Sequence, residues 1–322
     1  MNKRKFYTKY DAGKTFCFAI FAPYIFAFIL VVIAMISAKY SNVAYDELIK
    51  KPVFLAFSVI ISPLAFLCVY FLINKKAKID YKIASKIDFK VSFLNVILCI
   101  MIAFCCVFGF NNIVSMFDAL INKLGVKQST DLPLPLNNGF WLAFNIFALA
   151  LLPAIAEELI FRGVIFNGFS VYGKRKAIIY SAFLFALMHS SISQTVYPIL
   201  AGSVFALVVS KTDNILYSMI IHFCNNCIVV VNSYIVQVKN IEVQAYELSF
   251  INILLSVMFA VLASFVIFAI VKFLLKPSKK EEKIDLPEID KSEISEISKT
   301  SNKYLYVGVI CGIIFWITSL FV

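Results

Sequence analysis

The chain has 322 residues, of which 61% are hydrophobic and only 15% are charged, and its formal net charge is +11. Soluble proteins are about half apolar and about a quarter charged, so the composition excludes an ordinary soluble domain. It predicts an all-α polytopic integral membrane protein, because the long apolar runs suit helices rather than a β-barrel. We expect the positive charge to reflect Lys and Arg retained in the cytoplasm, with the lipid bilayer and no nucleic acid as partner.

Nine apolar runs are candidates for membrane helices. In chain order they are residues 16–38, 53–73, 91–116, 139–161, 177–189, 196–210, 215–235, 250–275 and 304–322. The run 177–189 is short for a full crossing, so we expect eight or nine crossings. Residues 276–303 mix Lys, Glu, Asp and Ser, a composition that predicts a charged flexible linker.

The distribution of Lys and Arg predicts the orientation. If the N-terminal tail is cytoplasmic and nine crossings alternate, all but six of the 30 basic residues lie inside. The six on the outside are Lys39, Lys50, Lys51, Lys123, Lys127 and Lys239. This asymmetry follows the positive-inside rule and predicts a cell-membrane protein with a cytoplasmic N-terminus and, with nine crossings, an external C-terminus.

Charged residues near the end of the run 139–161 point to a functional site. Each ionised group at the centre of a bilayer costs about 2.5–3.5 kcal/mol on insertion scales, so Glu157, Glu158 and Arg162 need partners. Glu158 and Arg162 are four residues apart and share a helix face, which predicts an ion pair that orients the site. Glu157 is rotated by about 100° and is left free for chemistry.

The two histidines of the chain, His189 and His222, also lie in apolar runs. His222 shares a helix face with Asn226, and Phe185 precedes His189 by one turn. At about 1.5 Å per residue, Glu157, His222 and His189 lie roughly 8, 10 and 18 Å from the cytoplasmic ends of their helices. These depths predict one shared cavity that opens toward the cytoplasm.

Two kinds of chemistry suit these side chains. Glu157 as general base, assisted by His189, activates water while His222 and Asn226 stabilise an oxyanion. Alternatively, Glu157, His189 and His222 bind a metal such as zinc and leave a position open for water. Both predict hydrolysis within a membrane.

Three patterns occur in order on successive apolar runs: Glu-Glu-x-x-x-Arg (Glu157 to Arg162), Phe-x-x-x-His (Phe185 to His189) and His-x-x-x-Asn (His222 to Asn226). Together they resemble the CPBP intramembrane protease family, which takes in CAAX prenyl endopeptidases and bacteriocin-processing and immunity proteins of the Abi type. The resemblance implies core helices around a cytoplasm-facing catalytic cavity. It implies Glu157 and His189 as the groups that activate water and His222 with Asn226 as the oxyanion site. It favours a mechanism without a metal cofactor, with zinc as the alternative.

The resemblance covers residues 139–235, and the apolar runs and composition of the rest of the chain give five segments in all. They are an N-terminal tail with three helices (1–138), the protease core (139–235), an eighth helix region (236–275), the linker (276–303) and a C-terminal helix (304–322). The expected substrate is a membrane-associated peptide or protein, by CAAX-type or bacteriocin-type processing, and Phe185 is a candidate substrate-binding residue.

Other readings stay open. The Glu158–Arg162 pair can serve helix packing alone, and the chain can be a non-catalytic scaffold, a bacteriocin-immunity protein or a small transporter. A transporter usually shows inverted repeats or broken helices in matching positions, which we do not find. The sequence has no His-Glu-x-x-His, Gly-x-Ser-Gly or Gly-x-Gly-Asp pattern, which excludes the zincin, rhomboid and presenilin types of site.

Overall fold

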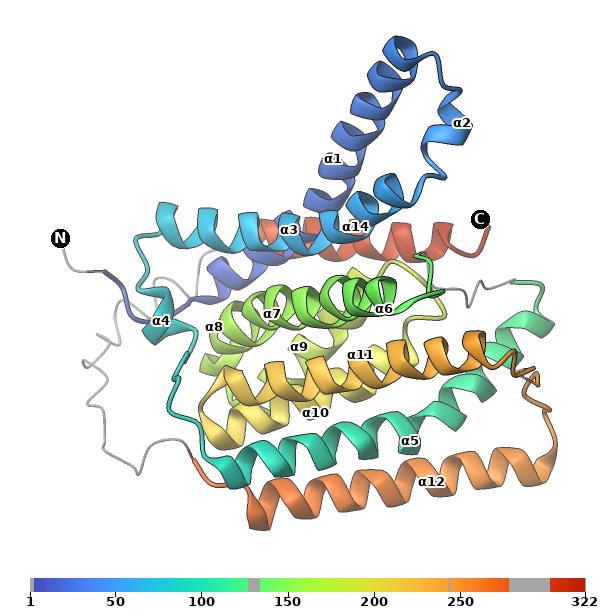
Figure 1. Cartoon of the computed structure of the whole chain (residues 1–322). Helices are drawn as coiled ribbons and strands as arrows, with labels where there is room; N and C mark the ends of the chain where they lie inside the picture. Colours follow the sequence, from blue (N-terminus) through green and yellow to red (C-terminus); the bar gives the residue numbers. More distant parts are fainter. Residues whose placement is uncertain (1–2, 127–133, 243, 278–301, 322) are drawn as a thin grey trace.

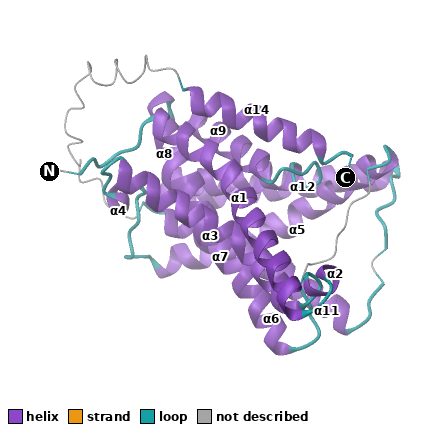
Figure 2. Cartoon of the chain, turned by 90° about the horizontal axis from the view of Figure 1, so that it is seen from above, coloured by secondary structure: helices purple, strands orange, loops and turns teal. Residues whose placement is uncertain are grey.

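The computed structural model describes residues 3–126, 134–242, 244–277 and 302–321. These residues are helical except for turns, loops and one isolated β-bridge between Arg4 and Ile79. Figure 1 shows the helices gathered into a bundle, and Figure 2 shows the same bundle from above. The predicted all-α class is confirmed.

The helices follow one another in this order: α1 Lys9–Ser41, α2 Tyr45–Leu48, α3 Pro52–Lys76, α4 Tyr81–Ala84, α5 Phe93–Lys123, α6 Gly139–Asn145, α7 Leu152–Glu158, α8 Asn167–Phe169, α9 Lys174–Met188, α10 Val196–Thr212, α11 Ile215–Val238, α12 Phe250–Ala269 and α14 Lys303–Thr318. Three wider π-helical segments, η1 Ile146–Leu151, η2 Leu159–Phe166 and η4 Ile270–Leu274, and a short 3₁₀ turn, η3 Ser170–Tyr172, join or extend them.

Each predicted apolar run coincides with a helix in the structure. By length and composition, six helical stretches of the described chain can cross a membrane, which makes this a multi-pass membrane protein. The apolar helices α10 and α14 are shorter, and α9 has 15 residues. The count of eight or nine crossings stays a prediction, and most of the predicted linker 276–303 lies outside the described residues.

Two prolines mark where α1 and α3 leave the bundle. The buried residues of α1 run from Asp11 to Ala22, apart from Ala34 further on, and those of α3 begin at Pro63. Pro23 and Pro63 lie inside these helices, where the missing N–H favours a kink. Figure 1 shows the outer halves of both helices forming an arm that carries α2 at its tip.

Helices α1, α3, α9, α10 and α11 pack against the segment 139–172, and α5, α12 and α14 pack on the outside of these helices. One hydrophobic cluster joins α1, α3 and α9 to η2, and α14 packs on α1 and α9. A second cluster joins α5, α10, α11 and α12. These clusters cross the predicted segment boundaries at 138 and 235, while the division into segments itself stays a prediction. The candidate site therefore lies where the two clusters meet.

The chain termini lie at opposite ends of the bundle. Figure 1 shows the N-terminus and α4 at one end and the C-terminus at the other. Helices that alternate in direction give this arrangement when the number of crossings is odd, and the number of crossings stays a prediction. That the N-terminal end is cytoplasmic stays a prediction from the Lys and Arg count.

Candidate active site

The helix that carries the two glutamates is not a regular α-helix. Pro153 has no N–H to donate to the Leu149 carbonyl four residues before it, and the chain widens into η1 just ahead of this proline. After Glu158 the chain widens again into η2, and the Asn167 side chain donates to the carbonyls of Arg162 and Gly163 at 2.9 and 2.8 Å. Such π-helical turns are frequent at functional sites.

Glu158 and Arg162 form the predicted ion pair. The Arg162 Nη1 atom donates to Glu158 Oε1 at 2.8 Å, and both side chains are fully buried. Arg162 Nη2 donates to the Gly202 carbonyl at 2.9 Å, and the guanidinium lies 4.5 and 5.2 Å from the ring centres of Phe185 and Phe205. The pair thus ties α10 to the glutamate helix through charge-assisted bonds.

Gly202 allows α10 to approach this closely. A Cβ atom at this position would lie 3.0 Å from Phe185 Cδ1 and 3.1 Å from Arg162 Nη2. We expect Gly202→Val to destabilise the protein by about 1–3 kcal/mol, because the added methyl groups overpack the contact. Thermal unfolding in detergent measures the effect. Gly139→Val is the matched control, since nothing lies within 4 Å of a Cβ there; equal stability of the two variants would contradict the expectation.

His222 lies between the two glutamates. Its Nδ1 atom is 3.1 Å from Glu158 Oε1, and its Nε2 atom is 3.8 Å from Glu157 Oε2. Because the ionised Glu158 carboxylate can only accept, we assign the proton of this bond to Nδ1. The residue is 4% exposed, and its ring stacks on Phe205 with 5.1 Å between ring centres, so its orientation is set by packing on one side and by Glu158 on the other.

Asn226 bonds to the Leu149 carbonyl, which has no α-helical donor four residues on because Pro153 lacks an N–H. Its Nδ2 atom donates to the Leu149 carbonyl at 3.1 Å, and its Oδ1 accepts from Asn225 Nδ2 at 3.4 Å. Asn225 in turn accepts a hydrogen bond from the Tyr197 hydroxyl. One N–H of the Asn226 amide is therefore used by the helix opposite, and the second is available to a ligand.

His189 follows the last residue of α9. Its Nδ1 atom is 2.8 Å from the Phe185 carbonyl, and its ring meets the Phe185 ring edge to face at 5.0 Å. The loop after it is tied to the C-terminal helix, since Trp316 Nε1 donates to Thr195 Oγ1 at 2.7 Å. The Ile192 N–H donates to the Ser319 hydroxyl at 3.2 Å in the same region. The C-terminal helix thus helps to position the residues next to His189.

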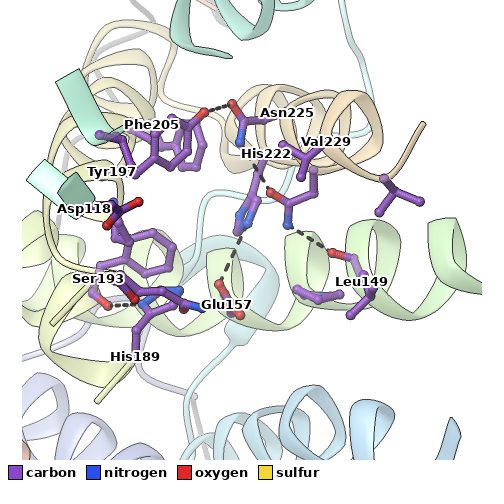
Figure 3. A pocket seen from close by; sticks show the side chains of 18 residues that line it. Asp118, Leu149, Glu157, His189, Ser193, Tyr197, Phe205, His222, Asn225 and Val229 are labelled. Carbon is purple, nitrogen blue, oxygen red and sulfur yellow. Dashed lines mark hydrogen bonds and ion pairs between the residues drawn. The ribbon is translucent and has the colours of Figure 1, made fainter. Parts of the chain in front are cut away.

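These side chains line one cavity of about 510 Å³. Glu157, whose side chain is 13% exposed, lies on its wall together with His189, His222 and Asn226. Figure 3 shows the His222 ring directed at the Glu157 carboxylate. Phe185 also lines the cavity, but it is buried against Arg162 and both histidines, so its contacts show packing and its role in substrate binding stays a prediction.

The cavity includes polar residues that the sequence interpretation missed. These are Asp118, Ser193, Gln194, Tyr197 and Asn225. Asp118 was missed because the third apolar run was expected to end at residue 116, whereas α5 continues to Lys123 and carries Asp118 on the cavity wall. Asn225 adjoins Asn226 in a membrane helix, a signal that was present in the sequence.

The lining also shows in which direction the cavity extends. Asp118 lies near the C-terminal end of α5, and Ser193 and Gln194 belong to the loop that contacts the end of α14. The cavity thus extends toward the end of the bundle that carries the C-terminus (Figure 1). The N-terminus lies at the opposite end of the bundle. A cavity that opens at the C-terminal end would therefore face away from the side of the membrane that holds the N-terminus, so the two predictions of a cytoplasmic N-terminus and a cytoplasm-facing cavity conflict. Which end is cytoplasmic stays a prediction.

The alternative of a zinc site was tested on the arrangement of candidate ligands. Glu157 and His222 face each other, but in the described part of the chain no three His, Cys, Asp or Glu side chains are grouped so that they could hold a metal ion. His189 therefore does not complete a three-residue site with Glu157 and His222 in this arrangement.

Comparison with known proteins agrees with the geometry. Residues 139–228 match the family model of Rce1-like type II CAAX prenyl endopeptidases. No curated protein and no solved structure matches the chain. The matched segment contains both glutamates, both histidines, Arg162 and Asn226. Residues 139–228 of this multi-pass α-helical membrane protein are thus similar to the Rce1-like type II CAAX prenyl endopeptidase family, which is consistent with the predicted resemblance to the CPBP family.

Proposed function

We propose that this protein is an intramembrane endopeptidase that hydrolyses a peptide bond of a membrane-associated protein or peptide. One observation carries the proposal: Glu157, His189, His222 and Asn226 come from three separate helical regions and line a single cavity. Polar groups at membrane depth are costly and tend to mark function. The matched family supports protease chemistry.

Glu157 is the group that activates water in this proposal. It is the glutamate with access to the cavity, whereas Glu158 is fully buried and neutralised by Arg162. A carboxylate beside the cavity can take a proton from a water molecule as the water attacks the peptide carbonyl. It can then pass this proton to the leaving amine. His189 lines the same cavity and assists in orienting the water.

His222 and Asn226 stabilise the oxyanion. Since His222 Nδ1–H donates to Glu158, the ring becomes a donor toward the cavity when Nε2 also carries a proton. The positive charges of His222 and Arg162 then balance the negative charges of the two glutamates. Asn226 adds its second amide N–H. Donors fixed in advance by neighbouring bonds stabilise a developing negative charge without further reorganisation.

The proposed reaction is tested with quenched fluorescent peptides. Purified full-length protein in lipid nanodiscs is incubated with a pool of apolar peptides, and cleavage sites are read by mass spectrometry. Cleavage at defined bonds, lost on replacement of Glu157, supports the peptidase. A well-folded protein that cleaves no peptide and no membrane-anchored reporter would instead favour the scaffold or immunity alternatives of the same fold.

We further propose that hydrolysis needs no metal cofactor. The support is that Glu157 and His222 lack a third ligand in the described part of the chain. Activity is expected to be unchanged, within about twofold, by dialysis against EDTA or 1,10-phenanthroline. Metal analysis of the purified protein provides the second readout. Zinc at one equivalent, lost together with activity on chelation, would contradict this expectation.

A further inference from the structure

The cavity contains a carboxylate that the proposed mechanism does not use. Asp118 lies on α5, which precedes the matched segment 139–228. Val114, one helical turn earlier, lines the cavity as well. Two residues at this spacing define the face that α5 turns toward the cavity, so the side chain of Asp118 points into it. Figure 3 shows its carboxylate in the same cavity as Glu157 and His189.

This carboxylate has no counter-charge in the described structure. Its Oδ1 atom is buried and has no hydrogen-bond partner among the described residues. Each of the other two acids of the site has a basic partner, since Glu158 pairs with Arg162 and Glu157 faces His222. None of the described residues that line the cavity is Lys or Arg. Among the described residues that line the cavity, Asp118 is therefore the acid that forms no ion pair with a basic side chain.

We propose that Asp118 forms a subsite for a cationic group of the substrate peptide, either a Lys or Arg side chain or a free N-terminal ammonium group. This deepens the proposed peptidase function and rests on it. A cation suits the position because an unpaired carboxylate in a partly desolvated cavity attracts positive charge more strongly than one in water. The volume of about 510 Å³ is within the range of small-ligand pockets and accommodates a short stretch of peptide.

The other residues that line the cavity determine which further side chains of a bound peptide it accepts. Val114, Pro198, Val229 and Val230 present apolar surface to the cavity. A bound peptide would thus place apolar side chains against these residues and one cation against Asp118. Ser193 and Gln194, on the loop after His189, supply uncharged polar groups to the same cavity.

Binding is measured independently of catalysis, in full-length Glu157→Gln protein in phosphatidylcholine nanodiscs. The probes are fluorescein-labelled apolar peptides in which each position in turn carries Lys, Gln or Glu, with the N-terminus either acetylated or free. We expect Lys at one position, or the free N-terminus, to bind about tenfold more tightly than its neutral counterpart. Adding Asp118→Asn should reduce this ratio to about one, and Asp118→Glu should restore much of it.

Asp46→Asn, on the exposed helix α2, is the matched control and should leave the ratio at about ten. Lack of any preference for a cation with Asp118 present, or a preference that survives Asp118→Asn, would overturn the subsite. Cleavage by protein with Glu157 intact is assayed in parallel. Selective binding of cations without cleavage would contradict the peptidase function and support the subsite. Cleavage without selectivity would support the peptidase function and contradict the subsite.

Discussion

Glu157→Gln is expected to lower the rate of peptide hydrolysis by about 10²–10⁴-fold, the contribution typical of a general base. The substitution keeps the size of the side chain and removes its ability to accept a proton from water. Stability should change little, because Glu157 has partial access to the cavity and the Nε2 atom of its neighbour His222 is 3.8 Å away. The loss should appear in kcat rather than in KM, since the proton is transferred only in the transition state.

Glu47→Gln provides the control, since this glutamate is exposed on α2 and should leave both activity and stability unchanged. Thermal unfolding, followed by tryptophan fluorescence, confirms that the Glu157 variant is folded. A folded Glu157→Gln protein that keeps more than about a tenth of the wild-type rate would show that another group activates the water, and the role assigned to Glu157 would be wrong.

Arg162→Met is expected to destabilise the protein by about 3–5 kcal/mol, the typical cost of removing one partner of a buried ion pair. Glu158 would be left fully buried with a negative charge that Arg162 no longer balances, although His222 still contacts it. The carbonyl of Gly202 would also lose its donor. Met fills much of the volume of Arg, so the effect reports charge and hydrogen bonding more than a cavity.

A second variant separates the charge from the packing. Adding Glu158→Gln to Arg162→Met removes the uncompensated charge but retains an acceptor for the Nδ1–H group of His222. We expect the double variant to be more stable than Arg162→Met alone, and thermal unfolding of the four proteins of this cycle measures the coupling. Arg175→Met, at an exposed position of α9, is the control. Additive losses would mean that the pair contributes little.

Composition and spacing by themselves determined the class of the protein and named the candidate residues of the site. A long apolar run in lipid folds as a helix, because in a helix every backbone N–H and C=O group forms its hydrogen bond within the same segment. This is why each predicted run coincides with a helix. The spacing of Glu158 and Arg162 predicted their pairing, since residues four apart face each other on a helix whatever surrounds it. The three patterns of Glu, His and Asn residues predicted the family.

Only the tertiary structure decided how these residues meet. That His222 contacts Glu158 through one nitrogen and faces Glu157 with the other depends on how α11 packs against the glutamate helix, 64 residues earlier in the chain. The Asn226 contact with Leu149 depends on the carbonyl that Pro153 leaves free across the same interface. Asp118 enters the cavity because α5 continues beyond its apolar run. Contacts of this kind join residues far apart in the chain, and local periodicity carries no information about them.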